Sequence, residues 1–283
     1  MAVAPYAPLM RVPAALAAQW EHERAWLDAL PTLVDGCVEQ WGLDLEEPVD
    51  TPHSLVVPAG EVVLKVNPPS HAEADREEDA LELWDGEGAV RLLARDDDRR
   101  ALLLERCRPG TRLWDAEVDA TTVVAELLPR LQVEVPTTHS FALLADEADR
   151  WAEAVPRWYQ KAGRPFERAL LDTALDVYRT VDRSAVRLVN QDLHGGNVLR
   201  AQREPWLVVD PKPLAGEREL EASGLLRNAD SVSRWLDVLA GLGLDRERAR
   251  GWGVAHNLAW AWDQRRGWLE QHVEDARRIL NAR

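Results

Sequence analysis

Three polar residues near the middle of the chain have types and spacing that suit phosphoryl transfer. Asp192 is followed five positions later by Asn197, and Asp210 closes the apolar run 206–209. An aspartate can accept the proton of an attacking hydroxyl group, while an amide oxygen and a second carboxylate can hold the Mg²⁺ that bridges nucleotide phosphates. The spacing therefore predicts Asp192 as a catalytic base and Asn197 and Asp210 as magnesium ligands.

Lysine is rare in this chain, which draws attention to the positions that keep it. Lys65, Lys161 and Lys212 are its three lysines, and the other basic residues among its 34 are arginines. A compact ammonium group fits a crowded phosphate site better than a planar guanidinium does. Lys65 ends a β-rich run and Lys212 follows Asp210, so we expect both lysines to contact the phosphates of a bound nucleotide.

The elements that would position Lys65 read as a small α+β lobe. Residues 12–42 show an imperfect helical stripe, and a second helix is expected to begin at Pro31. Two hairpins are predicted, over 54–66 and 89–105, with a charged amphipathic helix over 72–84 between them. This order of helix, hairpin, helix and hairpin is typical of an antiparallel sheet with packed helices.

The tripeptide Arg108-Pro109-Gly110 predicts a boundary between two lobes. We assign residues 1–107 to an N-terminal lobe with a nucleotide-binding sheet, and residues 108–283 to a larger, mainly helical C-terminal lobe. Helices are expected at 117–132, 143–155, 165–182, 218–241 and 246–280. The exception is a strand–loop–strand insert near 187–210, which carries the three residues that open this section.

A series of segments, in this order, resembles the aminoglycoside phosphotransferase family and, within it, the streptomycin 6-kinase and hydroxyurea phosphotransferase branch. The segments that carry the resemblance are 25–31, 88–93, 102–106, 192–199 and 204–214. The resemblance implies a bilobal, protein-kinase-like α+β fold. It also implies ATP- and Mg²⁺-dependent phosphorylation of a hydroxyl group on a small, cationic molecule, with an aminoglycoside of the streptomycin type as the leading acceptor.

For the nucleotide, the resemblance implies that Lys65 contacts the α- and β-phosphates and pairs with a carboxylate on the following helix. Glu73 and Glu77 lie one turn apart there and are both candidates, and the resemblance favours Glu77. Ser54, placed at the tip of the first hairpin, matches a serine that hydrogen-bonds the β-phosphate.

The adenine is expected against the connecting strand 104–107, where Glu105 and Cys107 would contact it. Nothing in the sequence matches a Gly-x-x-x-x-Gly-Lys-Ser/Thr loop, so the chain is not a P-loop kinase.

For the acceptor, Trp262 and Asp263 are the first candidates. An indole can stack on a sugar ring, and a carboxylate can pair with a cationic group. Glu221 follows the metal-binding strand at a position where the family often has aspartate, and we place it in the same acceptor set. Other carboxylates of this lobe could also lie near a cationic acceptor: Glu217, Glu219, Asp230 and Asp237.

Two further positions depart from the family pattern. Asn190 stands where the family commonly has histidine, and the pair Gly195-Gly196 replaces bulkier residues, which could loosen the loop. Asn190 and Glu221 together leave open a nucleotide-binding protein with a degenerate kinase site. A second alternative keeps the reaction and changes the acceptor to hydroxyurea or another small metabolite.

Composition excludes several classes of partner. The chain has 49 acidic and 34 basic residues and a formal net charge of −15, whereas nucleic-acid binding needs a basic face. A strongly acidic surface suits a cationic ligand instead. Cys37 and Cys107 lie far apart and lack metal-type spacing, which favours a reducing compartment over a disulfide framework.

Membrane association is not expected either. No run is long and apolar enough to span a bilayer, and prolines interrupt the alanine-rich stretch 1–8, which lacks the features of a signal peptide. We therefore expect a cytoplasmic protein whose partners are a nucleoside triphosphate and a small acceptor. The oligomeric state is not indicated.

Overall fold

The computed structural model describes residues 11–227 and 229–282, and these form two compact units. One unit runs through Gly86 and resumes at Val90–Cys107, and the other comprises Glu87–Ala89 and the chain from Arg108 onward. The second junction falls where the sequence places the lobe boundary. The short segment Glu87–Ala89 joins the second unit because the Val208 backbone N–H donates to the carbonyl of Gly88, at 2.9 Å.

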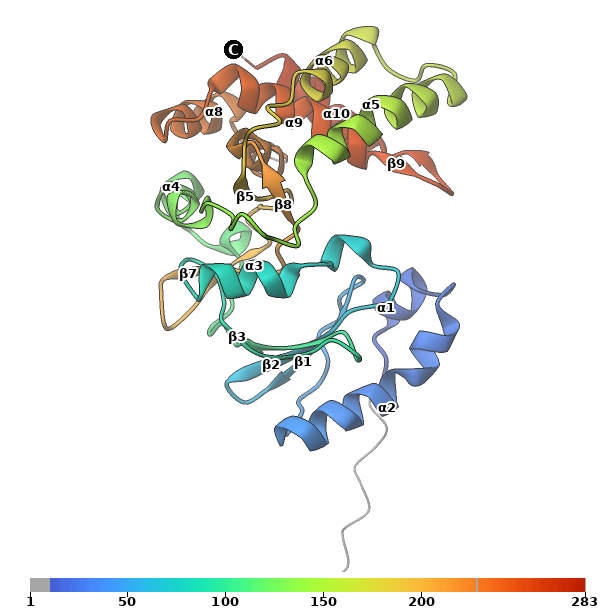
Figure 1. Ribbon diagram of the computed structural model, residues 1–283, viewed down its shortest axis with the longest axis vertical. Coiled ribbons are helices and arrows are strands. Elements are labelled where there is room, and N and C mark those ends of the chain that lie inside the picture. Colours follow the sequence, from blue (N-terminus) through green and yellow to red (C-terminus); the bar gives the residue numbers. More distant parts are fainter. Residues whose placement is uncertain (1–10, 228, 283) are drawn as a thin grey trace, which may run out of the picture. The chain divides into compact units, whose positions relative to one another are not determined.

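The first unit is built on a four-stranded antiparallel sheet (Figure 1). Its strands are β1 (Leu55–Ala59), β2 (Val62–Val66), β3 (Leu92–Asp96) and β4 (Ala101–Glu105), in the order β1-β2-β4-β3. Its helices are α1 (Ala14–Gln19), α2 (Arg24–Trp41), the 3₁₀ turn η1 (Ala72–Ala74) and α3 (Glu77–Trp84). Both predicted hairpins are present, and α2 and α3 lie on opposite faces of the sheet (Figure 1).

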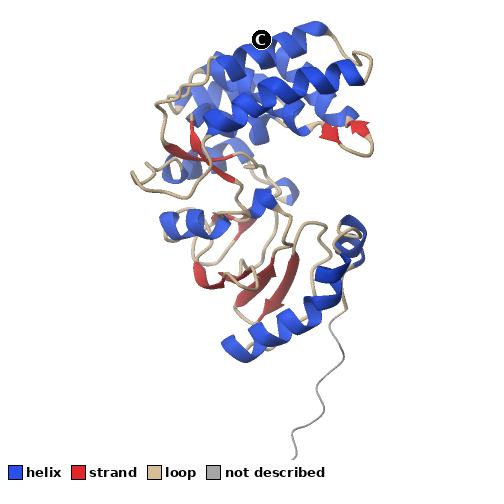
Figure 2. Ribbon diagram, turned by 45° about the vertical axis from the view of Figure 1, so that its right-hand side comes forward, coloured by secondary structure: helices blue, strands red, loops and turns tan. Residues whose placement is uncertain are grey.

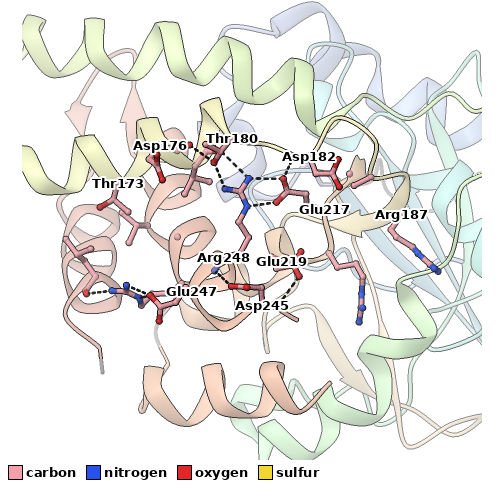
Figure 3. Close-up of a pocket in the computed structure, with 18 residues that line it drawn as sticks. Thr173, Asp176, Thr180, Asp182, Arg187, Glu217, Glu219, Asp245, Glu247 and Arg248 are labelled. Carbon is pink, nitrogen blue, oxygen red and sulfur yellow. Dashed lines mark hydrogen bonds and ion pairs between the residues drawn. The ribbon is translucent and has the colours of Figure 1, made fainter. Parts of the chain in front are cut away.

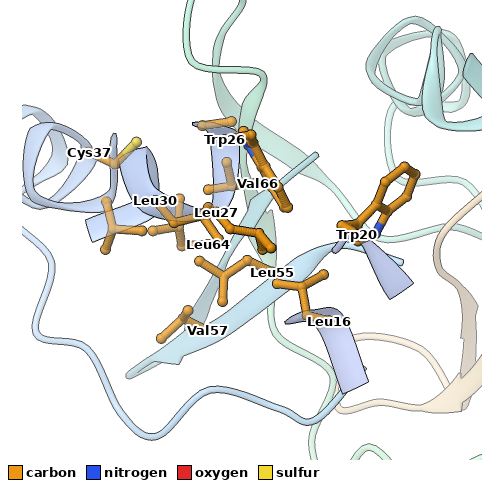
Figure 4. Packing of buried hydrophobic residues seen from close by; sticks show 12 residues of the cluster. Leu16, Trp20, Trp26, Leu27, Leu30, Cys37, Leu55, Val57, Leu64 and Val66 are labelled. Carbon is orange, nitrogen blue, oxygen red and sulfur yellow. The ribbon is translucent and has the colours of Figure 1, made fainter. Parts of the chain in front are cut away.

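Alternation along β2 decides what each face of that sheet carries. Leu64 and Val66 are buried in an apolar cluster with side chains of α1 and α2, including Leu16 and Leu30 (Figure 4). Because successive strand residues point to opposite faces, Lys65 between them faces the side that bears α3. The hydrophobic cluster therefore fixes the register that delivers Lys65 to α3.

The prediction that a helix begins at Pro31 is wrong, because Pro31 lies inside α2. An interior proline removes a hydrogen bond and costs about 3 kcal/mol. Burial of Trp26, Leu30 and Val34 on the same helix face outweighs it, since each such side chain contributes about 1.5–3 kcal/mol. The break between helices falls earlier, before Arg24.

The predicted helix 72–84 is also divided. Arg76 adopts a left-handed conformation (φ 71°), so the chain turns between η1 and α3. Helix α3 then begins at Glu77, with acidic residues throughout its first turn, where the helix dipole favours negative charge. The break places Glu77 at a helix start, which a continuous helix would not do.

The second unit is mainly helical, as predicted, with short strand pairs around the insert near 187–210 (Figure 2). Its helices are α4 (Ala120–Leu131), α5 (Leu144–Lys161), α6 (Arg168–Arg179), α7 (Ala222–Leu226), α8 (Val232–Gly241), α9 (Arg246–Trp260) and α10 (Glu270–Leu280), with 3₁₀ turns η2 (Leu113–Asp115) and η3 (Arg218–Glu221). Its strands are β5 (Arg187–Asn190), β6 (Val198–Arg200), β7 (Trp206–Val208), β8 (Pro213–Gly216), β9 (Trp262–Asp263) and β10 (Gly267–Trp268).

Two of the long helices predicted here are interrupted. The stretch 218–241 folds as η3, α7 and α8, and 246–280 folds as α9 and α10 with the β9–β10 hairpin between them. Asp263 causes the second interruption, because its carboxylate accepts hydrogen bonds from the backbone N–H groups of Arg265 and Arg266 and so forms a turn. Within the part of the chain that the structure describes, no helix is both long and apolar enough to cross a bilayer.

Candidate active site

The loop between β5 and β6 carries Asp192 and is held at both ends by strand pairing. β5 pairs with β8 and β6 pairs with β7. Within the loop, the Asn197 side-chain nitrogen donates to the backbone oxygen of Asp192 at 3.1 Å and lies 3.4 Å from its carboxylate. Because the amide nitrogen faces Asp192, the amide oxygen is the atom that a cation would use.

Asp210 reaches the same loop through the end of β7. The backbone N–H of Val209 donates to the carbonyl of Asn197 at 2.9 Å, which joins the two predicted metal ligands through the main chain. Asp210 has a left-handed backbone (φ 51°), a conformation that costs about 1–2 kcal/mol for a residue with a β-carbon. Lys212, which is buried, donates to its carboxylate at 2.7 Å. Lys212 therefore contacts the proposed metal ligand directly.

Asn190 links the loop that carries Asp192 to the segment that carries Asp210 and Lys212. Its side-chain oxygen accepts from the backbone N–H groups of Asp192 (3.1 Å) and Lys212 (3.0 Å). The side chain is fully buried, and its amide nitrogen has no hydrogen-bond partner among the described residues. Asn190 thus holds the loop that carries Asp192 to the segment that follows Asp210.

Glu221 does not occupy the acceptor position that we predicted for it. It is fully buried, and it accepts hydrogen bonds from the backbone N–H of Asn190 (3.0 Å) and from the side chain of Gln132. Burial raises the pKa of Glu221 to about 8. Glu221 therefore holds the backbone of Asn190 in place, and it has no exposed surface that an acceptor could contact.

Two residues that contact Asp192 or its loop were not predicted from the sequence. Arg227 lies with a guanidinium nitrogen 3.4 Å from the Asp192 carboxylate, and its guanidinium sits 5.2 Å from the ring centre of Trp260. Trp114 stacks on His194 at 4.6 Å with an angle of 9° between the rings. Both come from distant parts of the sequence, and an arginine among so many others gave no signal.

On the first unit, Lys65 and Glu77 form the predicted ion pair. The Lys65 ammonium lies 2.6 Å from the Glu77 carboxylate, and both side chains are buried. The alternative partner, Glu73, has a side chain that lies outside the described residues. Pairing between a sheet lysine and a helix glutamate is the arrangement that steadies a phosphate-binding lysine in kinases.

Ser54 is not at the tip of the first hairpin. It precedes β1, opposite Asn67 at the open end, whereas the tip lies at Gly60. The Ser54 hydroxyl is buried and donates to the side-chain oxygen of Asn67 at 2.6 Å. The expected strand 54–57 also begins at Ser54, so that strand too would place Ser54 at the open end; the observed β1 begins one residue later and ends two residues later.

The first two residues of the connecting strand 104–107 form the end of β4. The backbone N–H of Glu105 donates to the carbonyl of Arg91 at 2.9 Å, and its carboxylate accepts from the N–H of Arg91 at 3.1 Å. Cys107 is half-buried and is the last residue of the first unit. The adenine role of these two residues stays a prediction.

The two acceptor candidates of the β9–β10 hairpin have structural partners. Trp262 stacks on Trp158 at 5.7 Å with nearly parallel rings, and the Lys161 ammonium lies 5.6 Å from its ring centre. Hydrogen bonds from the backbone N–H groups of Arg266 and Arg265 lower the pKa of the Asp263 carboxyl group. Trp262 is half-buried, so part of its surface stays accessible. Their contact with an acceptor stays a prediction.

Other carboxylates considered for the acceptor line a cavity of about 700 Å³ among α6, η3 and α9 (Figure 3). Glu217 is buried there and bonded to Arg248 and to the indole N–H of Trp252. Burial opposes its ionisation, yet these hydrogen bonds keep the pKa of Glu217 below its usual value. Glu219 accepts from the backbone N–H of Asp245. These charges are already paired, and no residue of our predicted site lines the cavity.

Comparison with known proteins decides the family. Residues 43–267 match the model of the aminoglycoside/hydroxyurea antibiotic resistance kinase family. The chain belongs to this family. It is therefore a phosphotransferase of the aminoglycoside type, and its resemblance to the streptomycin 6-kinase and hydroxyurea phosphotransferase branch is confirmed.

Curated relatives extend over most of this kinase. It is 36% identical to streptomycin 6-kinase of Streptomyces glaucescens, with 90% of this chain and 91% of the relative covered. It is 39% identical to hydroxyurea phosphotransferase of Kitasatospora aureofaciens, with 84% of this chain and 74% of the relative covered.

Solved structures confirm the kinase-like fold. Choline kinase LicA from Streptococcus pneumoniae matches with a TM-score of 0.63 at 12% identity, covering 89% of this kinase and 97% of that chain. A spectinomycin phosphotransferase in complex with ADP and spectinomycin matches with a TM-score of 0.58, also at 12% identity, covering 84% and 94%. At this level of identity the likeness concerns the fold.

Proposed function

We propose that this kinase transfers the γ-phosphoryl group of ATP, with Mg²⁺, to a hydroxyl group of an aminoglycoside of the streptomycin type. The observation that carries the reaction is the loop in which Asn190 binds the backbone of both Asp192 and Lys212. The acceptor rests on the streptomycin 6-kinase of Streptomyces glaucescens, which aligns over nine-tenths of both chains.

Each residue of the site has a distinct role in this proposal. Asp192 orients the acceptor hydroxyl and takes its proton as the new phosphate ester forms. Asn197 and Asp210 would hold Mg²⁺ through oxygen atoms, which the ion prefers, and Lys212 keeps the Asp210 carboxylate in place. When bound, the ion would supply positive charge that offsets the charge of the phosphates. Lys65, oriented by Glu77, contacts the phosphates of ATP.

Ser54, Glu105 and Cys107 complete the nucleotide site in the proposal. Ser54 is held by Asn67 at the open end of the β1–β2 hairpin and offers a hydroxyl oxygen there. Glu105 and Cys107 contact the adenine through the connecting strand. Trp262 and Asp263 remain our acceptor candidates, with the exposed part of the indole as the stacking surface.

Hydroxyurea is the second candidate acceptor, favoured by the 39% identity to a hydroxyurea phosphotransferase. The degenerate-site alternative is weakened by the geometry. Asn190 keeps two hydrogen bonds in the site, and Glu221 is built into the support behind it. The departures from the family pattern therefore leave the catalytic loop supported.

The test is phosphate transfer from radiolabelled ATP to streptomycin and to hydroxyurea, with Mg²⁺ present or chelated. Asp192→Asn should lower turnover by about 10²–10⁴-fold, because it removes the proton acceptor but keeps the side-chain shape. Asp172→Asn is the matched control, since Asp172 is an exposed residue of α6 paired with Arg168. Transfer that survives Asp192→Asn unchanged would refute the assigned base. Transfer to hydroxyurea alone would select the second acceptor.

A further inference from the structure

The pair Gly195-Gly196 follows His194 in the catalytic loop, and Trp114 occupies the space beside it. A β-carbon at Gly195 would lie 2.6 Å from the indole nitrogen of Trp114, and one at Gly196 would lie 2.7 Å from its Cζ3 atom. Neither glycine has a positive φ, so backbone conformation does not require glycine at either position. The indole therefore explains Gly195, and the indole together with the His194 ring explains Gly196.

The same indole confines His194. The rings stack at 4.6 Å, and the backbone N–H of Trp114 donates to the carbonyl of Gly195 at 3.3 Å. The Nδ1 atom of His194 accepts from the N–H of Gly196 at 3.0 Å, so the neutral ring carries its proton on Nε2. That Nε2 lies 3.6 Å from the Asp192 carboxylate. Trp114 and the loop backbone thus fix both the plane of the imidazole and the nitrogen that faces Asp192.

Among the described residues, three polar side chains approach the Asp192 carboxylate, and none of them lies closer than 3.4 Å. Asn197 and Arg227 approach it at 3.4 Å each, and His194 at 3.6 Å. Because these contacts are long, the position of the Asp192 carboxylate depends on the backbone of its loop. A displacement of a catalytic group by about 1 Å can lower the rate by about 10²-fold. The orientation of the base therefore depends on what fixes the loop.

We propose that Trp114 is a positioning residue for the phosphotransfer reaction. Its indole holds His194 and the Gly195-Gly196 backbone so that the Asp192 carboxylate keeps its orientation toward the acceptor hydroxyl. The inference rests on the proposed role of Asp192. Trp114 is 54% exposed, and the buried part of its indole lies against His194 and the Gly195-Gly196 backbone.

Steady-state kinetics with Trp114→Ala test the proposal. We expect kcat to fall by about tenfold to 10²-fold, with the KM values for ATP and acceptor nearly unchanged, because binding groups stay in place while the base is misaligned. Trp114→Phe keeps a flat ring over His194 and should recover most of kcat. A rise in KM at unchanged kcat would overturn the proposal and indicate an acceptor-binding role for the indole instead.

A double variant separates positioning from general packing. Gly195→Ala should displace the indole and lower kcat as Trp114→Ala does, and the combination of both should be no worse than either alone, since they remove one contact. Losses that multiply in the combination would contradict the shared contact. Trp41→Ala is the control for loss of a large aromatic side chain, because Trp41 packs on the apolar cluster of the first unit. It should lower the Tm and spare kcat.

Failure of this inference is distinct from failure of the proposed function. If Asp192→Asn abolishes transfer and Trp114→Ala leaves kcat intact, only the positioning role is lost. If transfer survives Asp192→Asn, the assigned base itself is wrong.

Discussion

The buried pair of Lys65 and Glu77 allows stability and activity to be separated by mutation. The ammonium and the carboxylate lie 2.6 Å apart, with 5% and 0% of the side chains exposed. At an effective dielectric constant of about 20, their attraction is about 6 kcal/mol. Desolvation of each ion costs several kcal/mol, so the net contribution of the pair is small. The second carboxylate oxygen of Glu77 has no hydrogen-bond partner among the described residues, which weakens the compensation further.

Breaking the pair has a different cost from replacing it. Lys65→Met leaves the Glu77 carboxylate buried without its counter-ion, and Glu77→Leu leaves the ammonium in the same state. Each should lower the free energy of unfolding by about 3–5 kcal/mol. The double variant Lys65→Met/Glu77→Leu has no buried charge at this position and should be within about 1 kcal/mol of wild type or more stable. The two variants without Lys65 should lose phosphate transfer, because Lys65 is the proposed phosphate ligand, and Glu77→Leu should lower it, because Lys65 loses the partner that orients it.

The assay is urea unfolding followed by far-UV circular dichroism, together with turnover of ATP and acceptor. Arg95→Met serves as the control, because Arg95 pairs with Asp79 at 3.2 Å on the exposed side of α3. Its loss should cost at most about 1 kcal/mol and leave activity intact. A double variant as unstable as the sum of the two single variants would refute the reasoning, because additive losses mean that the two charges have no coupling energy.

Two further predictions concern the support behind the catalytic loop. Asn190→Ala leaves the backbone N–H groups of Asp192 and Lys212 without their acceptor, which costs about 1–3 kcal/mol for each group. The variant should therefore have a lower Tm, and its kcat should fall by at least about tenfold. Wild-type kinetics in this variant would contradict the bridging role. Burial raises the pKa of Glu221 to about 8 from 4.5, so the folded protein keeps a proton that the unfolded chain releases between these values. The free energy of unfolding should therefore fall as the pH rises from about 4.5 to 8, by up to about 5 kcal/mol. Glu221→Gln cannot ionise and should flatten this dependence in urea unfolding across the window, whereas Glu219→Gln should not; equal slopes in all three proteins would contradict the buried neutral carboxyl.

The residues that could be predicted from the sequence are those fixed by local pattern. The alternation in β1 and β2 predicts the hairpin and places Lys65 on one face of it, and the spacing from Asp192 to Asn197 lies within a single loop. Glu77 was reachable because it lies near Lys65 in sequence and the family pattern favours it. Short sequence distance and strict periodicity carry this information without knowledge of packing.

The residues that could not be predicted depend on packing between distant segments. Trp114 contacts His194 of the catalytic loop although it lies some 80 positions earlier in the sequence. Arg227 contacts Asp192 from 35 positions later. Pro31 was misread as a helix start because local propensity was not weighed against the burial of its helix. The turn at Asp263 was missed because an apolar helical pattern on both sides concealed a side chain that binds its own backbone.

Asn190 and Glu221, the two positions that first suggested a degenerate site, are in direct contact. The backbone N–H of Asn190 donates to the Glu221 carboxyl group at 3.0 Å, and the Asn190 side chain then binds Asp192 and Lys212. A glutamate reaches one methylene further than an aspartate, and the side chain of Gln132 holds its other oxygen. Random loss of function would leave unrelated changes at separate positions. These two changes instead form one continuous chain of hydrogen bonds that ends at the proposed base, which is the arrangement expected of a working site with a different internal support.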